Sequence, residues 1–111
     1  MSVFLHALRG VLPEHAYPQA SIRDVIRAQP ELDRLGQRLT TSIFNHSGID
    51  TRHSVVPDFG QQEAGLFYDP QTQRMLSPST GQRNAYYVEH ATPLFLAAAR
   101  AALAASPHVQ A

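Results

Sequence analysis

The sequence contains no cysteine. This absence excludes disulfide bonds, cysteine-ligated metal sites and a cysteine nucleophile. Lysine is also absent, so all nine basic residues are arginine, and nine acidic residues bring the formal net charge to zero. A balanced charge provides neither a nucleic-acid footprint nor a polybasic membrane patch. We therefore expect no nucleic-acid, membrane or metal partner.

Long hydrophobic runs are missing as well. No apolar run approaches the roughly 18 residues that a membrane-spanning helix needs. The amino-terminal stretch MSVFLHALRGVLP lacks the basic start of a signal peptide, and His6 and Arg9 interrupt its apolar run. We therefore expect a cytoplasmic protein. A length of 111 residues, 43% of them hydrophobic, suits one globular domain.

The first third of the sequence predicts one extended or helical segment and one helix. Apolar residues on both faces of residues 2–11 fit a strand buried on both sides or the edge of a short helix. Two prolines in LPEHAYPQ indicate a loop. Ser21, with Asp24 three residues later, predicts a capping box at the start of a helix. Pro30 either ends that helix or begins the next one in its first turn, where a missing N–H costs little. The apolar face of that helix consists of Ile22, Val25 and Ile26.

The middle of the sequence predicts a second helix and a strand. The helix should run from about residue 31 to residue 44, with Glu31 and Asp33 in its first turn, where the helix dipole favours acids. Its apolar stripe at helical period consists of Leu32, Leu35, Leu39 and Ile43. Asn45 to Gly48 supply the stop, because glycine accepts a left-handed conformation at a helix end. The alternation in IDTRHSVVP then favours a half-buried strand.

Residues 57–83 predict a long loop, because three prolines and three glycines are spread along them. A loop of this length inside a compact domain is unusual. We expect it to be functional, mobile or packed against something that this chain does not contain. Its acids, Asp58, Glu63 and Asp69, should be solvated.

The segment NAYYVEHATPLFLAAARAALAAS predicts a long buried helix capped by Asn84. Two adjoining faces are apolar, and Arg100 is the one charged residue between Pro93 and the helix end. Pro93 removes one backbone hydrogen bond and should cause a kink. A buried helix needs cover on both sides, and the remaining residues offer little. We therefore expect the chain to continue or to bind a partner.

Three segments, LPEHAYPQ, SGIDTRHSVVP and NAYYVEHATPLFLAAARAAL, resemble in order and spacing the N-terminal part of type III polyketide synthases. These chalcone-synthase-like enzymes belong to the thiolase superfamily; the related ketoacyl synthases III are the alternative. The resemblance implies an α/β chain whose residues 1–111 form an incomplete N-terminal part of a thiolase-like αβαβα fold, mostly helical with one or two strands.

The resemblance also implies an activity that this chain lacks by itself. The family is homodimeric and extends acyl groups from coenzyme A thioesters by decarboxylative condensation with malonyl-CoA. Its catalytic Cys, His and Asn lie beyond the matching portion, so no catalytic residue carries over. We therefore expect an N-terminal segment that is inactive alone and binds no cofactor tightly. Its partners would be the family homodimer or the remainder of the synthase.

One binding residue carries over from the family. Basic residues on the helix before the Ser-Gly-Ile turn contact the coenzyme A phosphates there, and ELDRLGQRL matches the family pattern so as to place Arg38 at one of these positions. Arginine suits this task because its planar fork binds phosphate oxygens in pairs. Aligning from the turn backwards instead places His46 near a basic position. The alternative to coenzyme A contact is that Arg38 is simply a solvent-exposed arginine on the helix.

The histidine-rich stretch before Pro57 allows three interpretations. His46, Asp50 and His53 offer three metal-ligand types, although their spacing matches no metal motif. Arg52 and His53 could act as an electrostatic clamp and a base. The third interpretation is scaffold, in which Arg52 pairs with an acid such as Asp50 or one across the dimer. His53 then packs on the neighbouring helix, and Ile49 and Val55 face the core.

The sequence leaves alternatives open for the roles of several aromatic residues and for the function of the whole chain. Tyr86, Tyr87 and Phe95 suit either an acyl tunnel or a helix core. Glu89 and His90 resemble an acid–base pair, but neighbours on a helix point apart. For the whole chain, the alternatives to a synthase segment are a small noncatalytic protein that docks on a full-length synthase and an independent interaction module.

Overall fold

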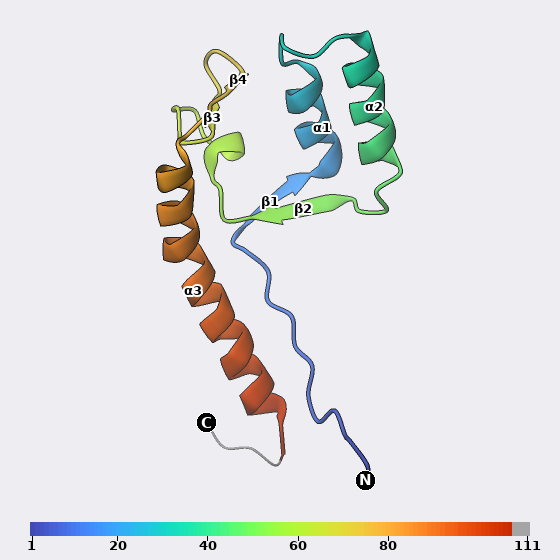
Figure 1. Cartoon of the computed structure of the whole chain (residues 1–111), viewed down its shortest axis with the longest axis vertical. Helices are drawn as coiled ribbons and strands as arrows, with labels where there is room; N and C mark the ends of the chain where they lie inside the picture. The colour runs from blue at the N-terminus through green and yellow to red at the C-terminus, as the bar shows by residue number, and fades with distance from the viewer. Residues whose placement is uncertain (108–111) are drawn as a thin grey trace. The chain divides into compact units, whose positions relative to one another are not determined.

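The computed structural model describes residues 1–107 and divides them into two compact units (Figure 1). One unit is Pro13–Ser79; the other combines Met1–Leu12 with the chain from Thr80 onward. Across the described residues the protein is a small α/β chain with three α-helices and two two-stranded antiparallel sheets.

The first sheet lies at the start of the unit Pro13–Ser79. Strand β1 (His15–Pro18) pairs antiparallel with β2 (Thr51–Ser54), so that Tyr17 lies opposite Arg52. The loop expected at LPEHAYPQ is therefore wrong in its second half. Proline is tolerated here because each strand of a two-stranded sheet is an edge strand, and Pro18 is the last residue of β1.

Helix α1 (Gln19–Arg27) follows β1 directly and begins two residues before the expected cap. Pro18 precedes the helix, and Ser21 makes no capping bond. The Asp24 carboxylate accepts a hydrogen bond from Arg23 Nε at 2.9 Å instead. The backbone N–H of Gln19 donates to the Asp50 carbonyl at 2.8 Å, which joins the start of α1 to the turn before β2.

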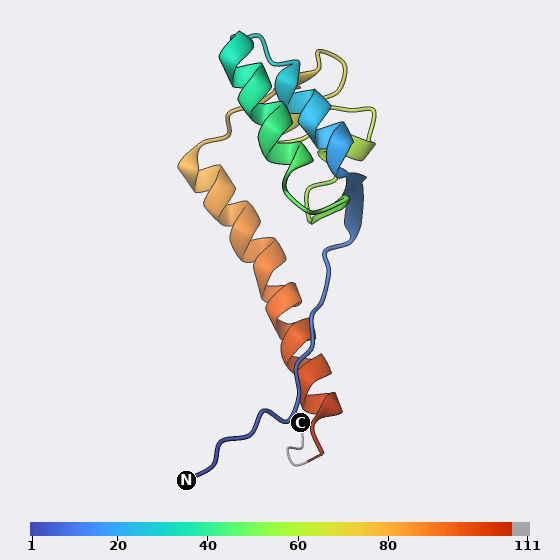
Figure 2. The same ribbon diagram turned by 90° about the vertical axis from the view of Figure 1, so that its right-hand side faces the viewer.

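Helix α2 (Arg34–Asn45) packs alongside α1, and both views show the two helices side by side (Figures 1 and 2). It begins three residues later than expected because Asp33 is the cap, accepting a hydrogen bond from Gly36 N at 2.7 Å. The stop expected at residues 45–48 is confirmed, because α2 ends at Asn45 and Gly48 adopts a left-handed φ of 76°. The apolar stripe of α2 does not face the core: Leu35, Leu39 and Ile43 are 62%, 53% and 66% exposed.

The half-buried side of α2 is a different one, on which Gly36, Thr40 and Phe44 recur at every fourth residue. Small side chains on a helix allow a neighbouring element to approach closely. The leucine and isoleucine stripe is left in solvent because none of the described elements of this unit covers it.

The expected loop at residues 57–83 contains more structure than its composition suggests. A 3₁₀ turn, η1 (Asp58–Gly60), is followed by the hairpin β3 (Tyr68–Asp69) and β4 (Arg74–Met75), and helix α3 begins at Thr80. The backbone reverses between the strands, where Gln73 adopts a φ of 57°.

Asp58 organises this loop, which corrects the expectation that it is solvated. It is 3% exposed, and its Oδ2 accepts hydrogen bonds from Phe67 N at 2.7 Å and Tyr68 N at 3.1 Å. The carboxylate lies so close to Gly65 that a Cβ at that position would overlap it. A charged group this deep is stable only when its oxygens are hydrogen-bonded.

Three aromatic rings form the core next to Asp58. The Phe59 ring lies 5.6 Å from that of Tyr17, edge to face, and 5.0 Å from that of Tyr68, stacked. Tyr17 and Tyr68 are among the few buried hydrophobic residues of the described chain, together with Ile22. Aromatic pairs at these separations add to the stabilisation from burial.

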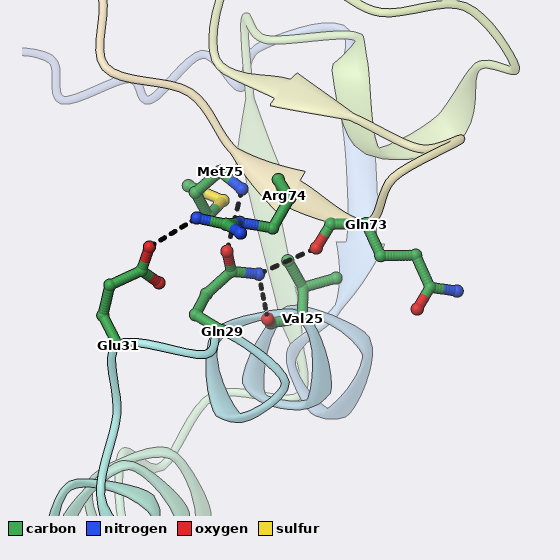
Figure 3. Close-up of polar contacts among 6 residues, drawn as sticks. All are labelled: Val25, Gln29, Glu31, Gln73, Arg74 and Met75. Carbon is green, nitrogen blue, oxygen red and sulfur yellow. Dashed lines mark hydrogen bonds and ion pairs between the residues drawn. The ribbon is translucent and has the colours of Figure 1, made fainter.

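Gln29, just after α1, holds the β3–β4 hairpin to the helix (Figure 3). Its side-chain nitrogen donates to the carbonyls of Val25 at 2.8 Å and Gln73 at 3.0 Å, and its Oε1 accepts from Met75 N at 2.9 Å. Beside it, Arg74 and Glu31 form an ion pair at 2.6 Å. One buried amide therefore uses both its donor and its acceptor to fix a hairpin that has two residues per strand.

The other unit contains α3 (Thr80–Ala105), which is uninterrupted at Pro93 and starts four residues before the expected Asn84. The expectation that this helix is buried is wrong, since none of its residues is buried. Residues 2–11 form neither strand nor helix, and Phe4, Leu5 and Leu8 are 73–79% exposed. Both segments lack cover among the described residues. No helix within residues 1–107 combines the length and apolar character needed to cross a membrane.

Candidate functional site

An open hollow of about 590 Å³ lies between the end of α1 and one side of α2. Four of its lining residues are arginine or histidine, and none is acidic. The full lining is Arg27, Arg34, Gln37, Arg38, Thr41, Ser42, Asn45 and His46.

The lining residues from α2 lie on one side of that helix because of their helical spacing. Arg34 and Arg38 are four residues apart, so they are neighbours on one side of α2, and Thr41 and Asn45 extend the same row. Arg27 is the last residue of α1 and adds a third guanidinium from the other helix. The hollow therefore offers guanidinium groups at one end and hydroxyl and amide groups along its length.

The three arginines have no acidic partner. Within residues 1–107, the arginine ion pairs are Arg23 with Asp24 and Arg74 with Glu31, and none involves the arginines of the hollow. Unpaired guanidinium groups keep their fork of N–H donors available for carboxylate or phosphate oxygens. The hollow is thus a candidate binding site for an anion.

His46 closes the other end of the hollow. Its Nδ1 lies 2.8 Å from the Ser42 carbonyl oxygen. Because a carbonyl can only accept, Nδ1 carries a proton and donates it, which leaves Nε2 as the second ring nitrogen for a ligand. The hydrogen bond also fixes the ring orientation.

The two family-based alignments, which place either Arg38 or His46 at a basic position, indicate the same place. Both residues line this hollow. Coenzyme A contact by Arg38 itself stays a prediction. Sequence reasoning missed Arg27, because it belongs to the preceding helix and no spacing rule relates it to α2.

The structure does not support the metal site or the Arg52–Asp50 ion pair that were considered for the histidine-rich stretch. No group of three or more metal-binding side chains occurs in the part of the chain that the structure describes, so His46, Asp50 and His53 are not brought together. Within the described residues of this chain Arg52 pairs with no acid, Asp50 included; its Nε donates to Gln19 Oε1 at 3.1 Å, and its guanidinium lies 5.7 Å from the Phe44 ring centre.

Two further scaffold expectations for this stretch are corrected. His53 is exposed and so does not pack on a helix, and Ile49 is 47% exposed, because the described chain provides no layer beyond β2. Arg52 nevertheless has a structural role. Together with buried Gln19, it connects the sheet to the start of α1.

Tyr17 is a buried tyrosine whose pKa is clearly shifted. Burial, followed by the nearby negative charge of Asp58, raises its pKa above the ordinary value. The phenol therefore stays protonated and donates to the Val56 carbonyl oxygen. Its position in the aromatic core makes it a structural group.

Two of the three residues proposed for an acyl tunnel lie exposed on α3. Tyr87 and Phe95 are 59% and 65% exposed, whereas the Tyr86 ring lies 4.1 Å from that of His90. Glu89 Oε2 and His90 Nε2 are 4.0 Å apart.

No family model matches this sequence, and neither the curated proteins nor the solved structures provide a match.

Proposed function

We propose that the chain is the N-terminal segment of a type III polyketide synthase-like acyltransferase and that its arginine-lined hollow binds the phosphate groups of coenzyme A thioesters. The segment supplies binding and no covalent chemistry, because it has no cysteine to receive an acyl group. The αβαβα arrangement belongs to the complete fold of which this chain would provide one part.

The observation that carries the proposal is the unpaired state of three arginines around one open hollow. Like charges that gather without counter-charges are destabilising unless a ligand compensates them. Coenzyme A carries a pyrophosphate and a 3′-phosphate, which suit several separate guanidinium groups. A volume of about 590 Å³ also lies in the range of small-molecule and cofactor sites.

Calorimetric titration tests this proposal. The chain is titrated with coenzyme A, with 3′-dephospho-coenzyme A and with pantetheine. We expect affinity to fall as phosphates are removed and to weaken with added salt, because exposed charges are screened. Equal affinity for coenzyme A and pantetheine would contradict a phosphate site.

Arginine variants locate the binding. One charge-assisted hydrogen bond contributes about 1.5–3 kcal/mol, so Arg38→Ala should weaken coenzyme A binding by roughly tenfold to a hundredfold. Arg34→Ala, one turn earlier, should have a smaller effect if the family alignment is right. Arg83→Ala, an exposed helix arginine outside the hollow, is the matched control and should bind like the wild type. Unchanged affinity in Arg38→Ala would show that Arg38 does not contact coenzyme A and is an ordinary solvent-exposed arginine.

A second candidate function follows from the exposed stripe of α2, Leu35, Leu39 and Ile43. Contiguous apolar residues on a surface mark interaction sites. The chain would then be a noncatalytic protein that docks on a full-length synthase through this stripe. Leu39→Glu should abolish co-elution with such a synthase while leaving coenzyme A binding unchanged, which separates the two functions.

A further inference from the structure

A second hollow, of about 260 Å³, lies within the unit Pro13–Ser79, between one side of α1 and the β3–β4 hairpin. Tyr68 of β3 and Gln73, in the turn before β4, line it from the hairpin. The other four residues follow α1 at spacings of three, four and seven, so they share one side of the helix. The full lining is Ser21, Asp24, Val25, Ala28, Tyr68 and Gln73, and we refer to this site as the hairpin hollow.

Tyr68 brings to the hairpin hollow a hydroxyl group that has no protein partner. The residue is 7% exposed, and within residues 1–107 its hydrogen bonds are made by its backbone. In the same part of the chain, every side-chain oxygen that is shut off from solvent has a hydrogen-bond partner. The Tyr68 hydroxyl has none and must therefore still reach solvent. Because Tyr68 lines the hairpin hollow, its hydroxyl is free to bind a ligand there.

Two more oxygen-bearing side chains come from α1. Ser21 lies in the first turn of the helix and makes no capping bond. Asp24 lies one turn later, and its Oδ1 accepts a hydrogen bond from Arg23 Nε at 2.9 Å, which leaves Oδ2 for another donor. The hairpin hollow thus offers two hydroxyl oxygens and one carboxylate oxygen as hydrogen-bond acceptors.

The charge of the hairpin hollow is opposite to that of the arginine-lined hollow. Asp24 is its one charged lining residue, whereas the other hollow has three arginines and no acid. An anion would find no counter-charge among these lining residues, but a cation would find the Asp24 carboxylate. A primary ammonium group has three N–H donors, which suit three oxygen acceptors. The side chains of Val25 and Ala28 add an apolar surface, and this mixture is typical of small-molecule sites.

We propose that the hairpin hollow binds a small primary amine. Its ammonium group is held by Asp24, Ser21 and the Tyr68 hydroxyl, and its apolar body lies against Val25 and Ala28. This inference does not rest on coenzyme A binding, because the two hollows share no lining residue.

Three probes with the same phenylethyl body and different end groups test the class of ligand. They are phenethylamine, which is a cation, 2-phenylethanol, which is neutral, and 3-phenylpropionate, which is an anion. Titrations are followed through the amide signals of residues 13–79. We expect phenethylamine to bind with a dissociation constant on the order of millimolar, as suits so small a ligand, and to shift most strongly the amides of the lining residues. The alcohol should bind more weakly, and the anion should not bind.

Three outcomes of these titrations would overturn the proposal. The first is phenethylamine leaving the spectrum unchanged at concentrations of tens of millimolar. The second is 3-phenylpropionate binding as tightly as phenethylamine, which would indicate a purely apolar contact. The third is that the largest shifts fall on residues outside the hairpin hollow.

A charge variant tests the carboxylate. Asp24→Asn keeps the size of the side chain and removes its charge, so phenethylamine affinity should fall by about threefold to tenfold, whereas 2-phenylethanol affinity should not change. Glu63→Gln removes the charge of an exposed acid in the same unit that does not line the hollow, so it is the matched control and should bind like the wild type. Equal phenethylamine affinities for Asp24→Asn and Glu63→Gln would overturn the assignment of the ammonium position.

A hydroxyl variant tests Tyr68. Tyr68→Phe removes the hydroxyl and keeps the ring that stacks on Phe59, so phenethylamine affinity should fall by about threefold to tenfold, while the urea midpoint of unfolding stays the same. Tyr87→Phe removes an exposed hydroxyl from the other unit and should alter neither quantity. A Tyr68→Phe chain that binds phenethylamine like the wild type would overturn the role of this hydroxyl, whether or not its stability had changed.

Discussion

The contact between Asp58 and Gly65 provides the most direct stability test. Asp58→Ala removes the acceptor of two backbone N–H groups, those of Phe67 and Tyr68, in a site that is 3% exposed. Each buried N–H left without a partner costs about 1–3 kcal/mol, so the free energy of unfolding of this unit should fall by about 2–6 kcal/mol. For a small domain this is a large part of the total stability.

Gly65→Ala should destabilise the same place by a different route. The new methyl group overlaps the Asp58 carboxylate, which two hydrogen bonds hold in position, and overpacking of this kind costs about 1–3 kcal/mol. Gly60→Ala is the matched control in the same loop. Its Cβ would lie 3.4 Å from the nearest atom of Tyr17, which is a tolerable contact, so the variant should be nearly neutral.

The double variant Asp58→Ala/Gly65→Ala separates the two effects. Without a carboxylate at position 58, the three atoms nearest to the alanine Cβ at 65 are removed, so the double variant should be about as stable as Asp58→Ala alone, giving a coupling energy of about 1–3 kcal/mol. Urea unfolding, followed through the amide signals of residues 13–79, measures all four proteins. Additive losses, or a neutral Gly65→Ala, would refute the close packing of the loop around Asp58.

Three further predictions concern other parts of the chain. The raised pKa of Tyr17 means that its phenol is ionised less readily in the folded state than in the unfolded one. Stability should therefore be constant with respect to this group below the ordinary tyrosine pKa of about 10 and should decline as pH rises beyond it; Tyr17→Phe should flatten that decline in urea midpoints measured at alkaline pH. Gln29→Ala should free the hairpin β3–β4, with a loss of about 2–3 kcal/mol and faster hydrogen exchange at the Met75 amide, whereas Gln71→Ala in the same hairpin should change neither. The purified chain should decarboxylate no malonyl-CoA, and turnover that a point mutation abolishes would contradict this.

Periodicity and turn chemistry predicted the main helices but not their burial. The ranges of α2 and α3 follow from apolar spacing and from signals such as Gly48, and the structure places them within a few residues of expectation. Burial depends on what covers a face, and no pattern within a helix encodes this. The stripe containing Leu39 and the face containing Phe95 are therefore predictable as apolar and yet lie exposed.

The short strands and the polar core were missed for a related reason. β3 and β4 have two residues each, which is too short for any alternation of apolar and polar residues. β1 was missed because the prolines around it predict a loop. Asp58 and Gln29 look like solvent-facing residues in sequence, because the backbone groups that hold them in the loop and the hairpin lie nine or more residues away along the chain; the Val25 carbonyl, four residues before Gln29, is the local exception. The arginine-lined hollow was half predictable: helix spacing groups Arg34 with Arg38, but only the packing of α1 on α2 adds Arg27.

The sequence distances between contacting residues set an order for folding. The hollow is built from two helices that are close neighbours in the chain, and such local contacts form quickly. Gln29, by contrast, bonds to residues 44 and 46 positions away, and the Tyr17 hydroxyl to one 39 positions away, so these contacts must close long loops first. The α1–α2 pair should therefore be assembled before the sheet and the aromatic core, and the arginine cluster should exist in kinetic intermediates that still lack both.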